Sequence, residues 1–149
     1  MRWDVPAVVG FGLAAERSAA WQGRAERVGA LRDRLEAALT GLAGVTVNTG
    51  GAPRGPKHSN LRFADVDGQT LLMNLDAFGV LASAGSACSA GSVEPSHVLT
   101  AMGLPPGVAA TSVRFSLGDH LDDAAVDEAV RRVTLALRRS RGEVVGAEA

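Results

Sequence analysis

Apolar side chains recur at three- and four-residue spacing in four parts of the chain, which is the pattern of helices that bury one face. These parts are residues 13–42, 69–78, 95–101 and 125–137. Residues that often cap helices stand at their borders: Asp67 and Asp122 or Asp123 at the beginnings, and Gly44 and Gly79 at the ends. The pattern therefore predicts one long helix near the N-terminus and three shorter helices after it.

Four short segments outside these helices have the pattern of strands. They are residues 45–47, 59–66, 80–82 and 112–117. The strands are short and few, and they alternate with helices. The sequence therefore predicts one small α/β (α+β-like) domain of 149 residues, with a short, mostly antiparallel sheet and helices packed on one of its faces.

Composition and charge exclude several classes of function. Hydrophobic residues make up 46% of the chain and charged residues 21%, which is typical of a globular protein. The net charge of −1 does not favour binding to nucleic acid or to an anionic membrane surface. No apolar run approaches the roughly 20 residues that span a bilayer, and an acid at Asp4 argues against a signal peptide. A single cysteine suits a cytoplasmic protein, because it excludes an internal disulfide.

The candidate nucleophile is Cys88, which stands within a run of small residues, 83–97, made largely of serine, alanine and glycine. Such a run buries little apolar surface, so we expect an exposed, flexible loop. A free cysteine is more often an inert buried side chain. In an exposed loop the better interpretation is a reactive thiol on a mobile arm.

The other titratable residues offer weaker signals. His58, His97 and His120 stand far apart and lack carboxylate or cysteine neighbours at ligand spacing, so we expect no metal site in the folded domain. His97 is expected to cap or pack within its short helix. The only lysine, Lys57, and its neighbour Arg54 lie in a loop rich in glycine and proline and are expected to be solvated charges. No glycine-rich phosphate-binding loop of standard spacing is present.

Three motifs together resemble one known family. They are AGSACSAG at 84–91 followed by EPSHVL at 94–99, SVRFSLG at 112–118, and DVPAVVGFG at 4–12. In order and spacing they are similar to the C-terminal part of group I (NifS/IscS-like) cysteine desulfurases, which are pyridoxal-phosphate (PLP) enzymes of the aminotransferase class V family. The cysteine loop, 83–95, resembles that of the long-loop subgroup.

The resemblance implies a cysteine desulfurase, which uses PLP to remove sulfur from L-cysteine and yields L-alanine and a persulfide on Cys88. It also implies that Arg114 binds the substrate carboxylate, although without the resemblance we would expect a surface arginine on a strand. The sulfur would pass to acceptor proteins such as an iron–sulfur scaffold or a tRNA thiolase, and Cys88 could share a cluster with a scaffold. Full-length members are homodimers, and we expect no direct contact with nucleic acid or membrane.

A PLP enzyme of this class also needs a lysine, an aspartate and a phosphate cradle, which in the family lie in a large N-terminal domain. Lys57 stands in the wrong place for the Schiff base. We therefore expect residues 1–149 to be the small C-terminal domain of a fold-type I PLP enzyme, without its large domain and inactive alone. Two alternatives remain open: a PLP-independent persulfide relay module, and a remnant without function whose exposed apolar face would promote self-association.

Overall fold

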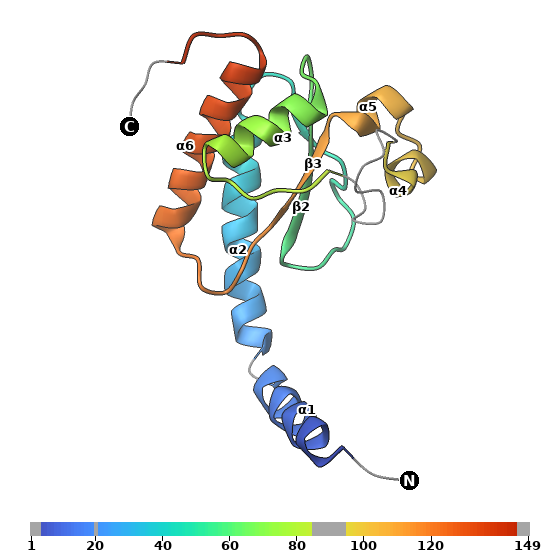
Figure 1. The fold of residues 1–149 in the computed structure, drawn as a ribbon, viewed down its shortest axis with the longest axis vertical. Helices are drawn as coiled ribbons and strands as arrows, with labels where there is room; N and C mark the ends of the chain where they lie inside the picture. The colour runs from blue at the N-terminus through green and yellow to red at the C-terminus, as the bar shows by residue number, and fades with distance from the viewer. Residues whose placement is uncertain (1–3, 20, 85–94, 146–149) are drawn as a thin grey trace.

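A computed structural model describes residues 4–19, 21–84 and 95–145 (Figure 1). The elements in chain order are α1 (Val5–Ser18), α2 (Trp21–Thr40), β1 (Val45–Val47), β2 (His58–Phe63), α3 (Gly68–Ala77), α4 (His97–Ala101), α5 (Pro106–Ala110), β3 (Ser112–Ser116) and α6 (Asp123–Ser140). Together they form a small mixed domain with a three-stranded sheet, which confirms the predicted fold class.

The sheet is antiparallel throughout, with the strands in the order β1-β2-β3. β2 is the middle strand, so Leu61 pairs with Val47 on one side and with Val113 on the other. Every second side chain of β2 is buried, at Ser59, Leu61 and Phe63. The side chains between them therefore lie on the opposite face, which we call the outer face.

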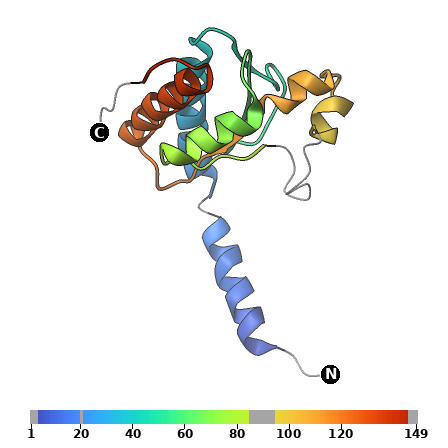
Figure 2. The same cartoon turned by 45° about the horizontal axis from the view of Figure 1, so that its top comes forward.

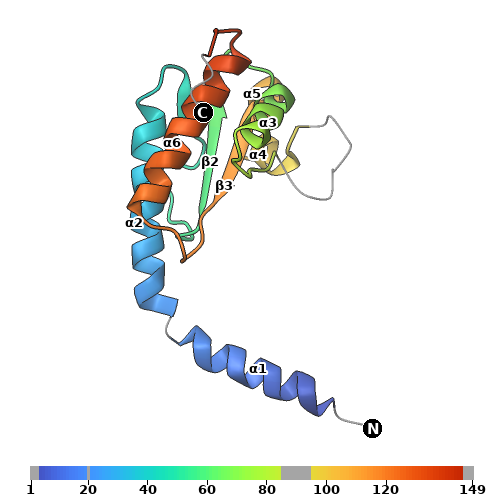
Figure 3. The same cartoon turned by 60° about the vertical axis from the view of Figure 1, so that its left-hand side comes forward.

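Three helices cover the inner face of the sheet, as the sequence predicted. α6 contacts both α2 and α3, while α2 also contacts β1 and β2, and α3 contacts β3. Figure 3 shows α2 and α6 running side by side along the strands. In the core between these layers, the rings of Phe63 and Phe115 meet edge to face with their centroids 6.4 Å apart. Burying a side chain of this size stabilises the fold by about 1.5–3 kcal/mol.

The first helix, α1, extends away from the rest of the domain (Figures 1 and 2). The sequence predicted one helix over 13–42, whereas the structure has two: helical structure already begins after Asp4, and α1 ends at Ser18 before α2 begins at Trp21. The Asp4 carboxylate accepts a hydrogen bond from the Ala7 amide (3.2 Å), and Pro6 occupies the first turn. None of the residues of α1 is buried. Among the described residues, no helix is long and apolar enough to cross a bilayer.

Local signals at helix starts explain both a success and a miss. Asp67 and Asp122 are confirmed as N-caps, since each accepts a hydrogen bond of 2.8 Å from a backbone amide of the following first turn. α5 was not predicted from the sequence, because two adjacent prolines, at 105–106, usually end a helix. Pro106 instead opens this helix, which suits a residue with a fixed φ and no N–H to leave unpaired.

Two predicted strands differ in extent from the observed structure. Residues 80–82 form no strand, and only Ser83 pairs with β3, through an isolated bridge to Arg114. The strand expected over 59–66 ends at Phe63, because the chain then turns through Asp65, which has a positive φ of 62°. The sheet therefore has one pairing beyond β3, at the residue that begins the candidate cysteine loop.

The loop between β1 and β2 is held against α2 by its two cations. Glu36 on α2 is 7% exposed, and its carboxylate accepts two hydrogen bonds from the guanidinium of Arg54. The Nζ atom of Lys57 lies 4.2 Å from the ring centroid of Trp21, the first residue of α2. Arg54 is thus not simply a solvated charge, because it pairs with a carboxylate far away in the sequence. Lys57 is exposed, as expected, and its ammonium also contacts the ring of Trp21.

Candidate functional site

The candidate site lies on the outer face of the sheet, around Arg114 in β3. The backbone amide of Arg114 donates to the Ser83 carbonyl (2.7 Å), and the Ser83 amide donates back to the Arg114 carbonyl (3.1 Å). This pair of hydrogen bonds ties the first residue of the cysteine loop to the strand position that carries the arginine. The root of the loop is therefore fixed beside the backbone of Arg114 by the same pattern of hydrogen bonds that joins antiparallel strands.

The guanidinium of Arg114 has no hydrogen-bond or ion-pair partner within the described part of the chain, and its Nε atom is buried. A buried donor without a partner costs about 1–3 kcal/mol, and more when it carries charge. An arginine in this state matches an anion with two oxygens, because charge-assisted hydrogen bonds from a guanidinium to a carboxylate are strong and can be bidentate. The arrangement thus fits the predicted carboxylate role of Arg114, which stays a prediction.

A polar network lies beside Arg114 on the same face. Asn60 in β2 is the cross-strand partner of Arg114. Its Oδ1 atom accepts a hydrogen bond from Nδ2 of Asn48 (2.5 Å), which also donates to Oγ of Ser112 (2.9 Å). Arg62 donates from Nη1 to Oδ1 of Asn48 (3.1 Å). These residues were not predicted as site residues from the sequence. Only Asn60 and Arg62 carried a signal, because they alternate with the buried positions of β2 and therefore lie on the outer face.

Cys88, the predicted nucleophile, lies outside the described residues, so its role stays a prediction. The structure describes the two ends of its loop, at Ser83–Ala84 and Pro95–Ser96. His97 follows as the first residue of α4 and is exposed. Of the other histidines, His58 has its Nδ1 atom 3.0 Å from Oγ of Ser116, and His120 packs over Gly118.

The described residues do not fit PLP by themselves. The internal Schiff base of such a cofactor requires a lysine, and the single lysine of the chain, Lys57, places its ammonium over the ring of Trp21. What the described residues do offer is an unpaired guanidinium for an anionic group. The site is therefore suited to holding a substrate carboxylate rather than the cofactor.

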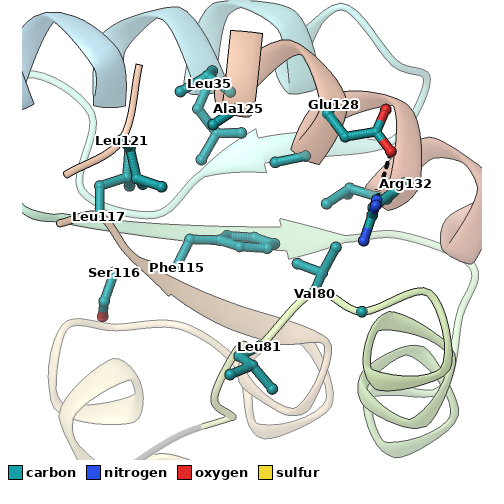
Figure 4. Close-up of a pocket in the computed structure, with 14 residues that line it drawn as sticks. Leu35, Val80, Leu81, Phe115, Ser116, Leu117, Leu121, Ala125, Glu128 and Arg132 are labelled. Atoms are coloured by element: carbon teal, nitrogen blue, oxygen red, sulfur yellow. Dashed lines mark hydrogen bonds and ion pairs between the residues drawn. The ribbon is translucent and has the colours of Figure 1, made fainter. Parts of the chain in front are cut away.

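An apolar cavity of about 310 Å³ lies between α6, β3 and the segment 79–81 (Figure 4). Phe115 and Leu121 are among the side chains that line it, and an ion pair between Glu128 and Arg132 stands at its edge (2.6 Å between Oε1 and Nε). Arg114 does not line this cavity. The cavity is therefore separate from the candidate site.

The fold and its outer face define the class of protein: a small α/β domain with an arginine at the root of a cysteine-containing loop, whose guanidinium has no partner among the described residues. The family model of class-V aminotransferases matches residues 3–128, and the chain belongs to this family. The resemblance inferred from the three sequence motifs is thereby confirmed.

Similar proteins include two cysteine desulfurases. The chain is 45% identical over 141 residues to the cysteine desulfurase IscS of Anaeromyxobacter sp. (strain Fw109-5), a match that covers 93% of this chain and 34% of the relative. It is 38% identical over 132 residues to the cysteine desulfurase NifS of Azotobacter vinelandii, covering 87% of this chain and 33% of the relative.

Solved structures agree with this assignment. The X-ray structure of a NifS-like protein from Rickettsia africae ESF-5 is similar to this chain with a TM-score of 0.76 and 25% sequence identity. The similarity covers 91% of this chain and 35% of that structure. The chain therefore spans about a third of the length of the relatives it matches.

Proposed function

We propose that this chain is the small domain of a cysteine desulfurase, in which Arg114 binds the carboxylate of L-cysteine and Cys88 accepts its sulfur. The observation that carries the proposal is the Nε atom of Arg114, which is buried and has no hydrogen-bond partner among the described residues. The backbone of the same residue is bonded to Ser83 at the root of the cysteine loop. The names of the similar proteins support the same reaction.

Covalent geometry supports the reach that this chemistry needs. Cys88 follows Ser83 by five residues (88 − 83), and five residues can span at most about 18 Å. Because Ser83 is bonded to Arg114, the thiol can approach a substrate whose carboxylate sits on that arginine. In the proposal the Cys88 thiolate forms a bond to the substrate sulfur while the carbon–sulfur bond breaks. The electron pair of that bond stays on the substrate Cβ, which takes up a proton, so that alanine leaves and the persulfide remains on Cys88.

The rest of the enzyme is also part of the proposal. PLP would be held by protein outside the described residues, and the whole enzyme would be a cytoplasmic homodimer that passes sulfur to an iron–sulfur scaffold or a tRNA thiolase. The exposure of α1 supports packing against such a larger body, because Val5, Val9 and Phe11 are 62%, 66% and 76% exposed. A helix that is apolar on all sides is normally buried.

A chimera tests the proposal directly. This chain would replace the matching third of the Anaeromyxobacter relative, and the intact mass would be measured after incubation with L-cysteine and PLP. We expect a gain of one sulfur atom that reductant reverses and that the Cys88→Ser control lacks. An Arg114→Lys chimera should need a much higher concentration of cysteine for the same rate, because lysine offers a point charge rather than a planar pair of donors.

The result that would overturn the proposal is a folded, PLP-bound chimera that forms no persulfide. The unfused chain provides a second test under the same conditions, and we expect it to gain no sulfur from L-cysteine. If it instead gained sulfur without PLP from a low-molecular-weight persulfide donor, the relay interpretation would be favoured over the desulfurase.

A further inference from the structure

We infer that Asn60 is a second donor to the substrate carboxylate, and that Arg62 and Asn48 hold it in the orientation that this role requires. The inference rests on the proposed function in one respect, namely that Arg114 binds that carboxylate. It is carried by the order of donors and acceptors on the outer face of the sheet.

The orientation of the Asn48 side chain follows from Arg62. A guanidinium has donors only, so the atom of Asn48 that faces Nη1 of Arg62, at 3.1 Å, is the carbonyl oxygen. The amide nitrogen of Asn48 must then take the other branch, which faces Oδ1 of Asn60 at 2.5 Å and Oγ of Ser112 at 2.9 Å. The arginine thus excludes the flipped form of this amide.

The orientation of Asn60 follows in turn from Asn48. Since Asn48 donates to it, the oxygen of Asn60 is directed toward Asn48, and its Nδ2 group takes the branch away from that residue. No acceptor among the described residues bonds this Nδ2 group. Arg62 thus fixes the orientation of the Asn48 amide, and Asn48 in turn fixes that of the Asn60 amide. The group of Asn60 that is left without a partner among the described residues is the Nδ2 donor.

The free donor stands beside the guanidinium of Arg114. The backbone amide of Asn48 donates to the Asn60 carbonyl (2.9 Å), which places Asn48 on the β1 side of Asn60, and Arg114 is the cross-strand partner on the β3 side. Side chains of directly opposed residues have Cβ atoms about 4.5–5.5 Å apart. Asn60 and Arg114 are thus neighbouring residues on one face, and neither the Nδ2 group of Asn60 nor the Nε atom of Arg114 has an acceptor among the described residues.

Two neighbouring donors without an acceptor match the two oxygens of a carboxylate. The amide adds a directed hydrogen bond without a second buried charge, so it restrains how the carboxylate sits on Arg114 as well as adding affinity. Asn60 would therefore act as a substrate-binding residue, and Arg62 and Asn48 as positioning residues.

A titration followed by NMR tests this on the 149-residue chain itself. The resonances to follow are the side-chain NH₂ of Asn60 and the Nε–H of Arg114, assigned by their loss in Asn60→Asp and Arg114→Lys. The probe is L-alanine, and the control is L-alaninamide, which lacks the carboxylate. We expect both resonances to shift with the same dissociation constant on adding L-alanine, and neither to shift with the amide.

Variants measure how much Asn60 contributes. Asn60→Asp keeps the shape of the side chain but places a carboxylate oxygen beside Arg114, whereas Asn60→Ala removes the donor. Each variant should raise the dissociation constant for L-alanine about tenfold, as expected for the loss of one hydrogen bond to a charged group. Arg62→Met should raise it less, because Asn48 and Asn60 would then be free to flip. Ser116→Ala, on the same face of β3, should leave it unchanged.

The outcomes separate this inference from the proposed function. If L-alanine shifts Arg114 but leaves Asn60 unmoved, or if Asn60→Ala binds as tightly as the wild type, Asn60 is not a ligand while the role of Arg114 stands. If neither resonance responds, the carboxylate site itself is refuted, and this inference is refuted with it.

Discussion

Replacing Arg54 by alanine should destabilise the domain more than the loss of an exposed ion pair would. Glu36 is 7% exposed, and Arg54 is the cation that its carboxylate contacts. Removing one partner of a fully buried ion pair costs about 3–5 kcal/mol, because the other charge stays buried and unpaired. The side chains here are 10% (Glu36) and 24% (Arg54) exposed, so water can reach part of the site. We therefore expect a loss of about 2 kcal/mol.

A double-mutant cycle checks the reasoning through urea unfolding of the wild type, Arg54→Ala, Glu36→Gln and the double variant. Because neutralising Glu36 removes the unpaired charge, the double variant should be about 1–2 kcal/mol more stable than the sum of the single changes predicts. The control is Arg138→Ala, whose pair with Glu143 is about half exposed and should contribute less than about 1 kcal/mol. Losses that add within about 0.5 kcal/mol would refute the expected interaction energy between Glu36 and Arg54.

Two other predictions concern α3 and α6. Gly68→Ala should lower the free energy of unfolding by about 1–3 kcal/mol, because an added Cβ would come 2.1 Å from the Ala110 carbonyl oxygen. The measurement is a thermal melt, and the control is Gly107→Ala, where nothing lies within 4 Å of an added Cβ. Equal melting temperatures of the two variants would contradict the close approach at Gly68. Hydrogen bonds from two arginines lower the pKa of Glu128 from 4.5 to about 2. The contribution of the Glu128 carboxylate to stability is therefore present above pH 4.5 and lost as the pH falls toward 2. Glu128→Gln should make the free energy of unfolding less dependent on pH in that window. An unchanged pH dependence would contradict the pairing of Glu128 with the two arginines.

Elements that depend on nearby residues were predictable from the sequence. Asp67 caps α3, and the alternation over 112–117 marks a strand with Val113 and Phe115 facing the core, as observed in β3. Errors arose where the local pattern allowed two outcomes. The spacing over 13–42 is helical throughout, yet the chain forms two helices, and the prolines at 105–106 both end one segment and open α5.

The sequence by itself determined the family and the candidate residues, because motifs are statements about residue type and spacing along the chain. Cys88 and Arg114 were selected as candidate residues from the motifs alone, without knowledge of the fold. The sequence could not show that Arg114 lacks a partner among the described residues, nor that Ser83 is bonded to the backbone of Arg114. Both facts depend on how distant segments pack.

Only the tertiary structure decided which polar residues stand beside Arg114. Asn48, Asn60 and Arg114 form a row across three segments because antiparallel pairing sets them opposite one another. A shift of one residue in that pairing would turn these side chains to the other face of the sheet. Register is a property of the assembled sheet rather than of any one strand, and for that physical reason Asn60 could be found only in the folded chain.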